Sequence, residues 1–157
     1  MNIKISIAFF GLIITLISCV VKTKKNEAKT NNLPIQGTWQ LLTATLVEKG
    51  DTTITQFTKK ISFIKIINDS HFAFLQHDNN KGKDSVPVYS SGGGSYLLTD
   101  SLYTEHLAYC SDRNWEGNDF KFIVQIKNDT LIQSGVEKVE SAGIDRTNIE
   151  KYVRVKR

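Results

Sequence analysis

The residues from 101 to 110 carry the side chains best suited to bind or transform a small molecule. The stretch SLYTEHLAYC alternates like a β-strand, in which neighbouring side chains point to opposite faces. One face would present two phenols, a carboxylate and an apolar group, from Tyr103, Tyr109, Glu105 and Leu107. The other would present a hydroxyl, an imidazole, a methyl group and a thiol, from Thr104, His106, Ala108 and Cys110. The alternation by itself leaves open which face is turned inward.

Catalytic and metal-binding patterns are weak in this sequence. Glu105 and His106 are adjacent, but on a strand they point to opposite faces and cannot act together on one substrate. His71 and His77 would share a face, yet at about 3.3 Å per residue they lie about 20 Å apart. The SGGGS stretch at 91–95 lacks the helix and Lys that follow a phosphate-binding loop, and instead predicts a bend or bulge. We therefore predict no catalytic residues, no metal and no cofactor.

A binding pocket is the better interpretation. Small-molecule pockets combine apolar walls with a few polar groups that orient the ligand. The tryptophan in the loop SDRNWEGN would lie at the mouth of the barrel. It would either fold back over the mouth as a lid, which we favour, or be exposed for contact with a partner or an apolar ligand. The predicted ligand-binding residues are Tyr96, Tyr103, Glu105, Tyr109, Trp115 and Gln133.

The elements that would position these residues are strands. Eight segments alternate in polarity or are rich in β-branched and aromatic residues. The clearest, at 119–127, turns Phe120, Phe122 and Val124 to one face and polar residues to the other, as a half-buried antiparallel strand does. In chain order the segments are 37–48, 61–67, 71–78, 86–99, 101–110, 119–127, 130–139 and 149–156.

The connections between these segments alternate in length. Tight turns are predicted at 68–70, at Asp100 and at 128–129, and long loops at 49–60, 79–85, 111–118 and 140–148. Alternate connections of an up-and-down sheet lie at one end, so all the tight turns would meet at the same end. Closing such a sheet removes its exposed edges, and eight strands leave room for one small ligand. The predicted fold is all-β, an eight-stranded up-and-down antiparallel β-barrel.

The first and last strands would meet at the tight-turn end of this barrel. There the guanidinium of Arg154 would lie across the indole of Trp39 and plug the bottom, a contact worth about 1–2 kcal/mol if desolvated. The stretch GTWQL, the alternation of loops and the late basic residue resemble the lipocalins and related calycin barrels. The stretch GGGSYLLTDSLYTEHLAY looks like the centre of a lipocalin-like domain of unassigned function, common in bacterial lipoproteins. The resemblance spans most of 35–156 and implies a barrel closed by Gly37, Trp39 and Arg154.

The N-terminal residues resemble an export signal. The apolar run at 5–17 is shorter than the roughly 20 residues that span a bilayer, but it suits a secretory signal peptide. The residues LISC that end it resemble the lipobox of bacterial lipoproteins, which implies cleavage after residue 18 and acylation of Cys19. Val20 follows instead of the Asp associated with inner-membrane retention, so we expect an outer-membrane anchor.

Three regions follow from this division: a signal peptide at 1–18, a lipidated N-terminus and disordered tether at 19–34, and the barrel at 35–157. The tether is rich in Lys and poor in apolar residues. The net charge of +4 comes from 20 basic and 16 acidic residues that are interleaved, which argues against nucleic-acid binding. With Cys19 acylated, the lone Cys110 cannot form an intramolecular disulfide.

We therefore predict a monomeric envelope lipoprotein, anchored in the outer membrane and facing the periplasm. Its barrel would bind a small apolar or amphipathic molecule as a carrier or sensor, without chemistry. One alternative is an isomerase- or hydrolase-type enzyme that uses Glu105 or His106 as a general base. Another is a protein-interaction module whose barrel interior is simply packed.

Overall fold

The computed structural model describes residues 33–57 and 59–156. The predicted signal peptide, the predicted acylation site Cys19 and most of the predicted tether lie outside these residues. Within the described part, no helix is long and apolar enough to cross a membrane. Two short 3-10 turns are present, η1 at Arg113–Trp115 and η2 at Glu140–Ala142. The strands are β1 (Gly37–Glu48), β2 (Asp51–Gln56), β3 (Ile61–Ile67), β4 (His71–Asp78), β5 (Tyr89–Thr99), β6 (Leu102–Cys110), β7 (Asp119–Lys127), β8 (Thr130–Val139) and β9 (Ile144–Arg154).

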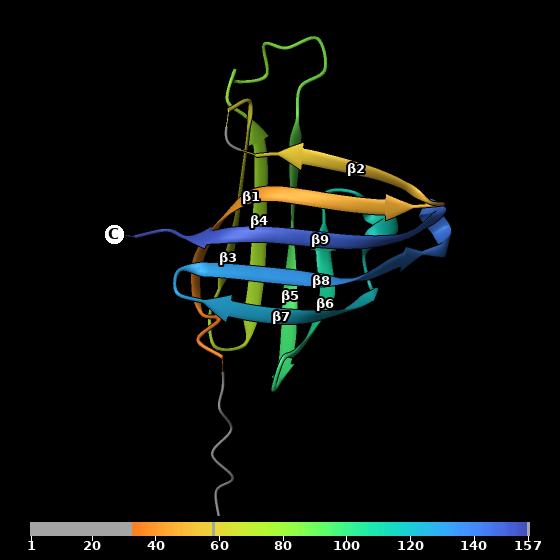
Figure 1. Ribbon diagram of the computed structural model, residues 1–157. Coiled ribbons are helices and arrows are strands. Elements are labelled where there is room, and N and C mark those ends of the chain that lie inside the picture. The colour runs from red at the N-terminus through yellow and green to blue at the C-terminus, as the bar shows by residue number, and fades with distance from the viewer. Residues whose placement is uncertain (1–32, 58, 157) are drawn as a thin grey trace, which may run out of the picture.

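The strands form one antiparallel sheet that closes on itself. From β3 to β9 each strand pairs with the next, and both β3 and β9 pair with β1. In Figure 1, β1, β9, β8 and β7 cross the front of the barrel, while β4, β5 and β6 run behind them at a steep angle. The predicted closed, eight-stranded, up-and-down β-barrel is therefore confirmed.

One strand lies where a long loop is predicted. β2 falls within 49–60 and pairs with the second half of β1, Thr43–Glu48, whereas β3 pairs with the first half, Gly37–Gln40. Both lie on the same side of β1, so β2 continues the edge where β3 ends and does not add a ninth strand to the closed barrel. Its sequence, DTTITQ, is exposed almost throughout and has no apolar alternation, which explains why the pattern missed it.

The last strand also begins earlier than predicted. β9 starts at Ile144, not Ile149, so most of the predicted loop at 140–148 is strand. The connection from β8 is only η2 and Gly143, whose φ of +67° is easily adopted by glycine. The earlier start brings Arg146 and Asn148 into the barrel wall.

The three tight turns lie at one end of the barrel, as predicted. Asp100 and Asn128 each adopt a left-handed conformation with φ of +55°. Asn68 instead accepts hydrogen bonds at Oδ1 from the backbone N–H groups of Ser70 and His71. The longer loops, at 79–88 and 111–118, lie at the opposite end.

Trp39 and Arg154 lie opposite each other at the tight-turn end. The Trp39 side chain is fully buried, and Cζ of Arg154 lies 4.0 Å from the centre of its ring. The guanidinium also donates hydrogen bonds to the carbonyl oxygens of Pro34 and Gln36, both at 2.6 Å. A Cβ on Gly37 would lie 2.6 Å from Nη1 of Arg154, so glycine gives the guanidinium room to lie there. These contacts close the bottom of the barrel.

Two bulges change which residues face the interior. In β1 the register against β9 shifts between Leu41 and Thr43, so that Leu41 and Ala44 are both buried. In β6 the register shifts opposite Gly93 and Gly94, and Ala108 is the extra residue. Beyond each bulge the odd and even positions of the strand exchange faces.

Candidate ligand-binding site

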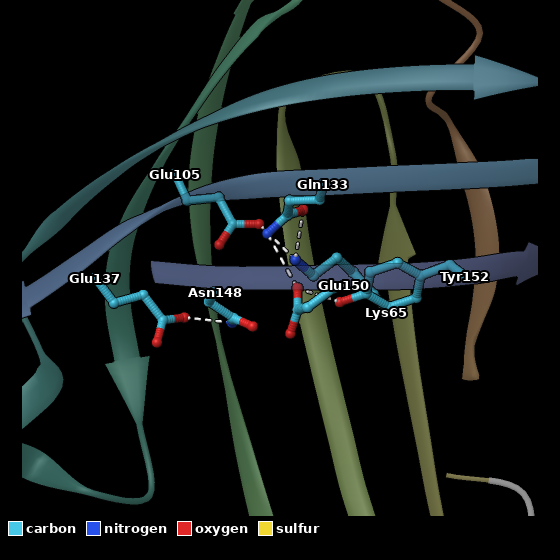
Figure 2. Close-up of polar contacts among 7 residues, drawn as sticks. All are labelled: Lys65, Glu105, Gln133, Glu137, Asn148, Glu150 and Tyr152. Atoms are coloured by element: carbon cyan, nitrogen blue, oxygen red, sulfur yellow. Dashed lines mark hydrogen bonds and ion pairs between the residues drawn. The ribbon is translucent and has the colours of Figure 1, made fainter. Parts of the chain in front are cut away.

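A cavity of about 400 Å³ opens at the long-loop end of the barrel. Six aromatic residues line it, one group being Phe57, Phe63 and Phe74 and the other Trp115, Phe120 and Phe122, and together they are called the aromatic wall. Polar residues lie among these rings: Lys65, Glu105, Gln133, Glu137, Arg146, Asn148 and Glu150. Glu105, for example, lies directly opposite Phe120 on the neighbouring strand. The polar residues come from β3, β6, β8 and β9, and Figure 2 shows all of them except Arg146.

Lys65 is one of the most buried members of this polar group, with an exposed fraction of 3%. Its Nζ donates to Oε1 of Glu105 at 2.8 Å and to Oε1 of Gln133 at 3.1 Å. Three aromatic rings surround the ammonium at 5.6–5.9 Å: Phe72, Tyr103 and Tyr152. Burial alone would lower the pKa of Lys65, but the negative charges of Glu105 and Glu150 outweigh it and raise that pKa. The ammonium is therefore charged and paired.

Gln133 connects the ammonium to a second carboxyl group. Its Nε2 donates to Oε2 of Glu150 at 3.2 Å, and the Tyr152 hydroxyl donates to the same oxygen at 2.7 Å (Figure 2). The orientation of the Gln133 amide follows from its partners, since an ammonium only donates hydrogen bonds. Burial raises the pKa of Glu150, although the charge of Lys65 and the Tyr152 hydroxyl oppose this shift.

A second cluster lies nearer the mouth. Glu137 accepts at Oε1 from Nδ2 of Asn148 at 2.7 Å and at Oε2 from Nε of Arg146 at 2.8 Å. The Arg146 guanidinium lies 5.4 Å from the centre of the Trp115 ring, which packs at 5.7 Å against Phe120. Trp115 is thus folded back over the aromatic wall and lines the cavity.

Two buried polar atoms have no hydrogen-bond partner among the described residues: Oδ1 of Asn148 and the hydroxyl oxygen of Tyr103. The Asn148 amide cannot simply be reversed, because its nitrogen faces a Glu137 carboxylate that only accepts. An unpaired buried polar atom usually costs about 1–3 kcal/mol, so Oδ1 of Asn148, which lines the cavity, is a natural point for contact with a bound molecule.

The inward face of β6 carries Tyr103, Glu105 and Leu107, all of which are buried. Of the predicted ligand-binding residues, Glu105, Trp115 and Gln133 line the cavity. Tyr103 lies beneath it, against Lys65. Tyr96 stacks on Tyr103 at 5.1 Å and donates its hydroxyl to the Asn68 carbonyl, so it belongs to the closed end.

The prediction for Tyr109 requires correction. The β6 bulge at Ala108 turns Tyr109 outward, where it is 72% exposed, and turns Cys110 toward the cavity. His106 also lies on the outer face, with Nδ1 2.7 Å from Oδ1 of Asp119. A general-base role for His106 inside the barrel therefore does not fit this structure.

Several cavity residues were not predicted: Lys65, Glu137, Arg146, Asn148 and Glu150. In β8 and β9 the usual pattern is inverted, because apolar Ile132, Val136 and Ile149 are exposed while polar residues face inward. One feature of the sequence could have indicated three of them: Arg146, Asn148 and Glu150 occupy every second position, so on a strand they would share one face. That signal is usable only once strand β9 is known to begin at Ile144.

The described residues contain no group of three or more His, Cys, Asp or Glu side chains placed to hold a metal ion. A search of curated proteins finds no match to this sequence. The model of one protein family, described as a domain of unknown function (DUF4488), matches residues 34–157. Since this match spans the whole barrel, the chain belongs to the DUF4488 family.

Proposed function

We propose that this protein is a lipid-anchored envelope protein whose barrel binds one small, partly apolar ligand as a carrier or sensor. The observation that carries the proposal is the cavity of about 400 Å³, whose lining combines aromatic rings with polar side chains. That size and composition are typical of small-molecule sites, in which apolar surface contributes affinity and polar groups orient the ligand. The resemblance to lipocalin-like domains supports the same class of function.

The cavity also favours binding over the two alternatives. A pure interaction module would be expected to fill its interior, whereas here a space remains between Phe74, Leu107 and Glu150. The predicted enzyme would use Glu105 as its general base, but one oxygen of this carboxylate is already bound by the Lys65 ammonium at 2.8 Å. Binding without chemistry is the function that this arrangement supports best.

The proposed anchor agrees with the orientation of the barrel. The described chain begins at Leu33, and the next residue, Pro34, contacts Arg154 at the closed end. If Cys19 is acylated, the tether joins the barrel at its closed end, so the point of attachment does not obstruct the mouth. This placement suits a monomeric protein that exchanges ligand with the periplasm. Replacement of Cys19 by Ser should abolish incorporation of labelled fatty acid and release the protein from the membrane fraction.

The binding proposal is tested by native mass spectrometry of the full chain purified from the cells that produce it. We expect a discrete bound mass that disappears on denaturation. Ser90 lines the cavity, so Ser90→Trp should place an indole there and remove the bound mass. Ser95→Trp, on the exposed face of the same strand, is the matched control and should retain it. The proposal fails if no bound mass is found, or if Ser90→Trp retains it.

A further inference from the structure

We propose that the ligand carries a protonated amine, which binds between Glu105, Glu150 and Asn148 while its apolar part lies against the aromatic wall. This inference rests on the proposed binding function and adds the chemical class of the ligand. It follows from the charge of the cavity, from its unused hydrogen-bond acceptors and from the position of its aromatic rings.

The cavity is acidic in a basic protein. Inside the cavity the lining contains three carboxyl groups, from Glu105, Glu137 and Glu150, and two basic groups, from Lys65 and Arg146, while the carboxyl group of Asp112 is exposed at the mouth. The formal charge of the fully ionised interior lining is therefore 2 − 3 = −1, whereas the chain as a whole carries +4. Since charges buried in a low-dielectric interior interact strongly, this imbalance favours a cationic guest.

Hydrogen-bond acceptors are left over in the same lining. The contacts among the described residues use Oε1 of Glu105 and Oε2 of Glu150, which leaves the second oxygen of each carboxyl group for a guest. Without a guest, burial favours the protonated form of Glu150, and an ammonium placed beside it favours the ionised form that accepts. The buried Oδ1 of Asn148 has no partner at all among these residues. An ammonium donates three hydrogen bonds and accepts none, so it matches this set of acceptors.

The acceptors lie on neighbouring parts of the lining. Asn148 and Glu150 alternate along β9, which places their side chains on one face about 7 Å apart. Gln133 lies opposite Glu150 on the adjacent strand and connects it, through Lys65, to Glu105. In Figure 2, Lys65, Glu105, Gln133 and Glu150 lie together, and Asn148 lies next to them beside Glu137.

The aromatic wall suits the rest of such a molecule. Phe63 and Phe74 stack with ring centres 5.6 Å apart, and Phe120 packs between Trp115 and Phe122. These rings offer apolar surface to a hydrocarbon or aromatic group and π-faces to a nearby cation. A ligand that extends from Glu150 toward Arg146 would span about 13 Å along β9, since four residues separate these positions.

An anionic ligand fits the same cavity poorly. The two basic groups are already paired, Lys65 with Glu105 and Arg146 with Glu137. A ligand carboxylate would have to break one of these ion pairs and would meet the net negative charge of the lining. A divalent metal is not favoured either, since no group of three ligating side chains is placed to hold one within the described residues.

Three probes of nearly equal size test the inference by calorimetric titration of the full chain: 2-phenylethylamine, 2-phenylethanol and phenylacetate. They differ in charge while keeping the phenyl ring. We expect the amine to bind at least tenfold more tightly than the alcohol or the acid. Equal binding of the alcohol, or preferential binding of the acid, would overturn the amine assignment but leave the binding function standing.

Matched variants locate the amine. Glu150→Gln should weaken binding of 2-phenylethylamine at least tenfold. Glu140→Gln, whose side chain is 87% exposed, should leave it unchanged. If the folded Glu150→Gln variant binds 2-phenylethylamine with unaltered affinity, the amine does not lie beside Glu150. If none of the three probes binds, the amine assignment is overturned. The bound mass of the purified chain then decides separately whether the cavity binds a ligand. The probe comparison needs no variant, so it remains decisive if Glu150→Gln does not fold.

Discussion

The Nζ atom of Lys65 on β3 lies 2.8 Å from Oε1 of Glu105 on β6, inside a barrel that encloses both. Their side chains are only 4% and 8% exposed, so water cannot compensate either charge if its partner is removed. Gln133 and Glu150 extend this pair across β8 and β9. The barrel interior is thus organised around a buried cation and not around a purely apolar core.

Removing the buried ammonium should destabilise the protein strongly. We expect Lys65→Met to lower the free energy of unfolding by about 3–5 kcal/mol, because it leaves the Glu105 carboxylate buried without a partner. Urea unfolding measures this change. The double variant Lys65→Met with Glu105→Gln should recover part of the loss, since no unpaired charge then remains. Additive losses in the double variant would contradict a coupled pair.

The barrel could be predicted from the sequence because its determinants are local. Tight-turn residues such as Asn68 and Asn128 and the alternation of β7 are visible in short stretches. The regular difference between short and long connections then predicts which strand ends lie together. The contact between Trp39 and Arg154 follows from closure of that arrangement.

The inner face could be predicted only in part, for two physical reasons. A bulge reverses the facing of all later residues in a strand, and nothing in the sequence around Leu42 marks the bulge in β1. The glycines at 92–94 do predict an irregularity, and the register shifts beside them, but the extra residue is Ala108 on the facing strand, which the glycines do not indicate. The hydrophobic pattern also assigns polar side chains to solvent, whereas here exposed Ile149 lies beside inward-facing Glu150. An inward-facing Lys65 was not predicted for the same reason: it lies between Ile64 and Ile66, which the hydrophobic pattern would turn inward in its place.

Stability should depend on pH through Glu150. Burial raises the pKa of Glu150 in the folded state above its ordinary value of 4.5, which applies to the unfolded chain. Above pH 4.5 the folded state therefore keeps a proton that the unfolded chain has lost. The folded state then binds more protons, and the free energy of unfolding falls as pH rises through the folded-state pKa. The groups that face this carboxyl are Lys65, Tyr103, Glu105, Gln133, Glu137 and Tyr152.

Glu150→Gln should remove this part of the pH dependence. The variant should gain stability relative to the native protein as pH is raised from about 4.5 toward 8, in urea unfolding at a series of pH values. Glu140→Gln, on the exposed η2 turn, should follow the native curve. A Glu150→Gln curve parallel to the native one would show that Glu150 has an ordinary pKa.

The plug at the closed end should require arginine and not merely a positive charge. Arg154→Lys keeps the charge but loses the planar group that lies on Trp39 and reaches two carbonyl oxygens. We expect a loss of about 1–2 kcal/mol in the free energy of unfolding. Arg113→Lys, whose side chain is 83% exposed, is the control and should change it little. Equal stability of the Arg154→Lys variant would mean that the stacking contributes nothing.

Gly94 should be intolerant of any side chain. A Cβ built there would overlap the carbonyl oxygen of His106 and lie 2.8 Å from the amide nitrogen of Ala108, both backbone atoms at the β6 bulge. Backbone paired in a closed sheet cannot move aside cheaply, so Gly94→Ala should cost about 3 kcal/mol or more in unfolding free energy. Ser95→Ala, at the next and exposed position, should cost little.

Since the bulge also sets the facing of Tyr109 and Cys110, a folded Gly94→Ala variant should show altered reactivity of the Cys110 thiol. Native stability together with native thiol reactivity would indicate that β5 and β6 approach less closely than the structure shows.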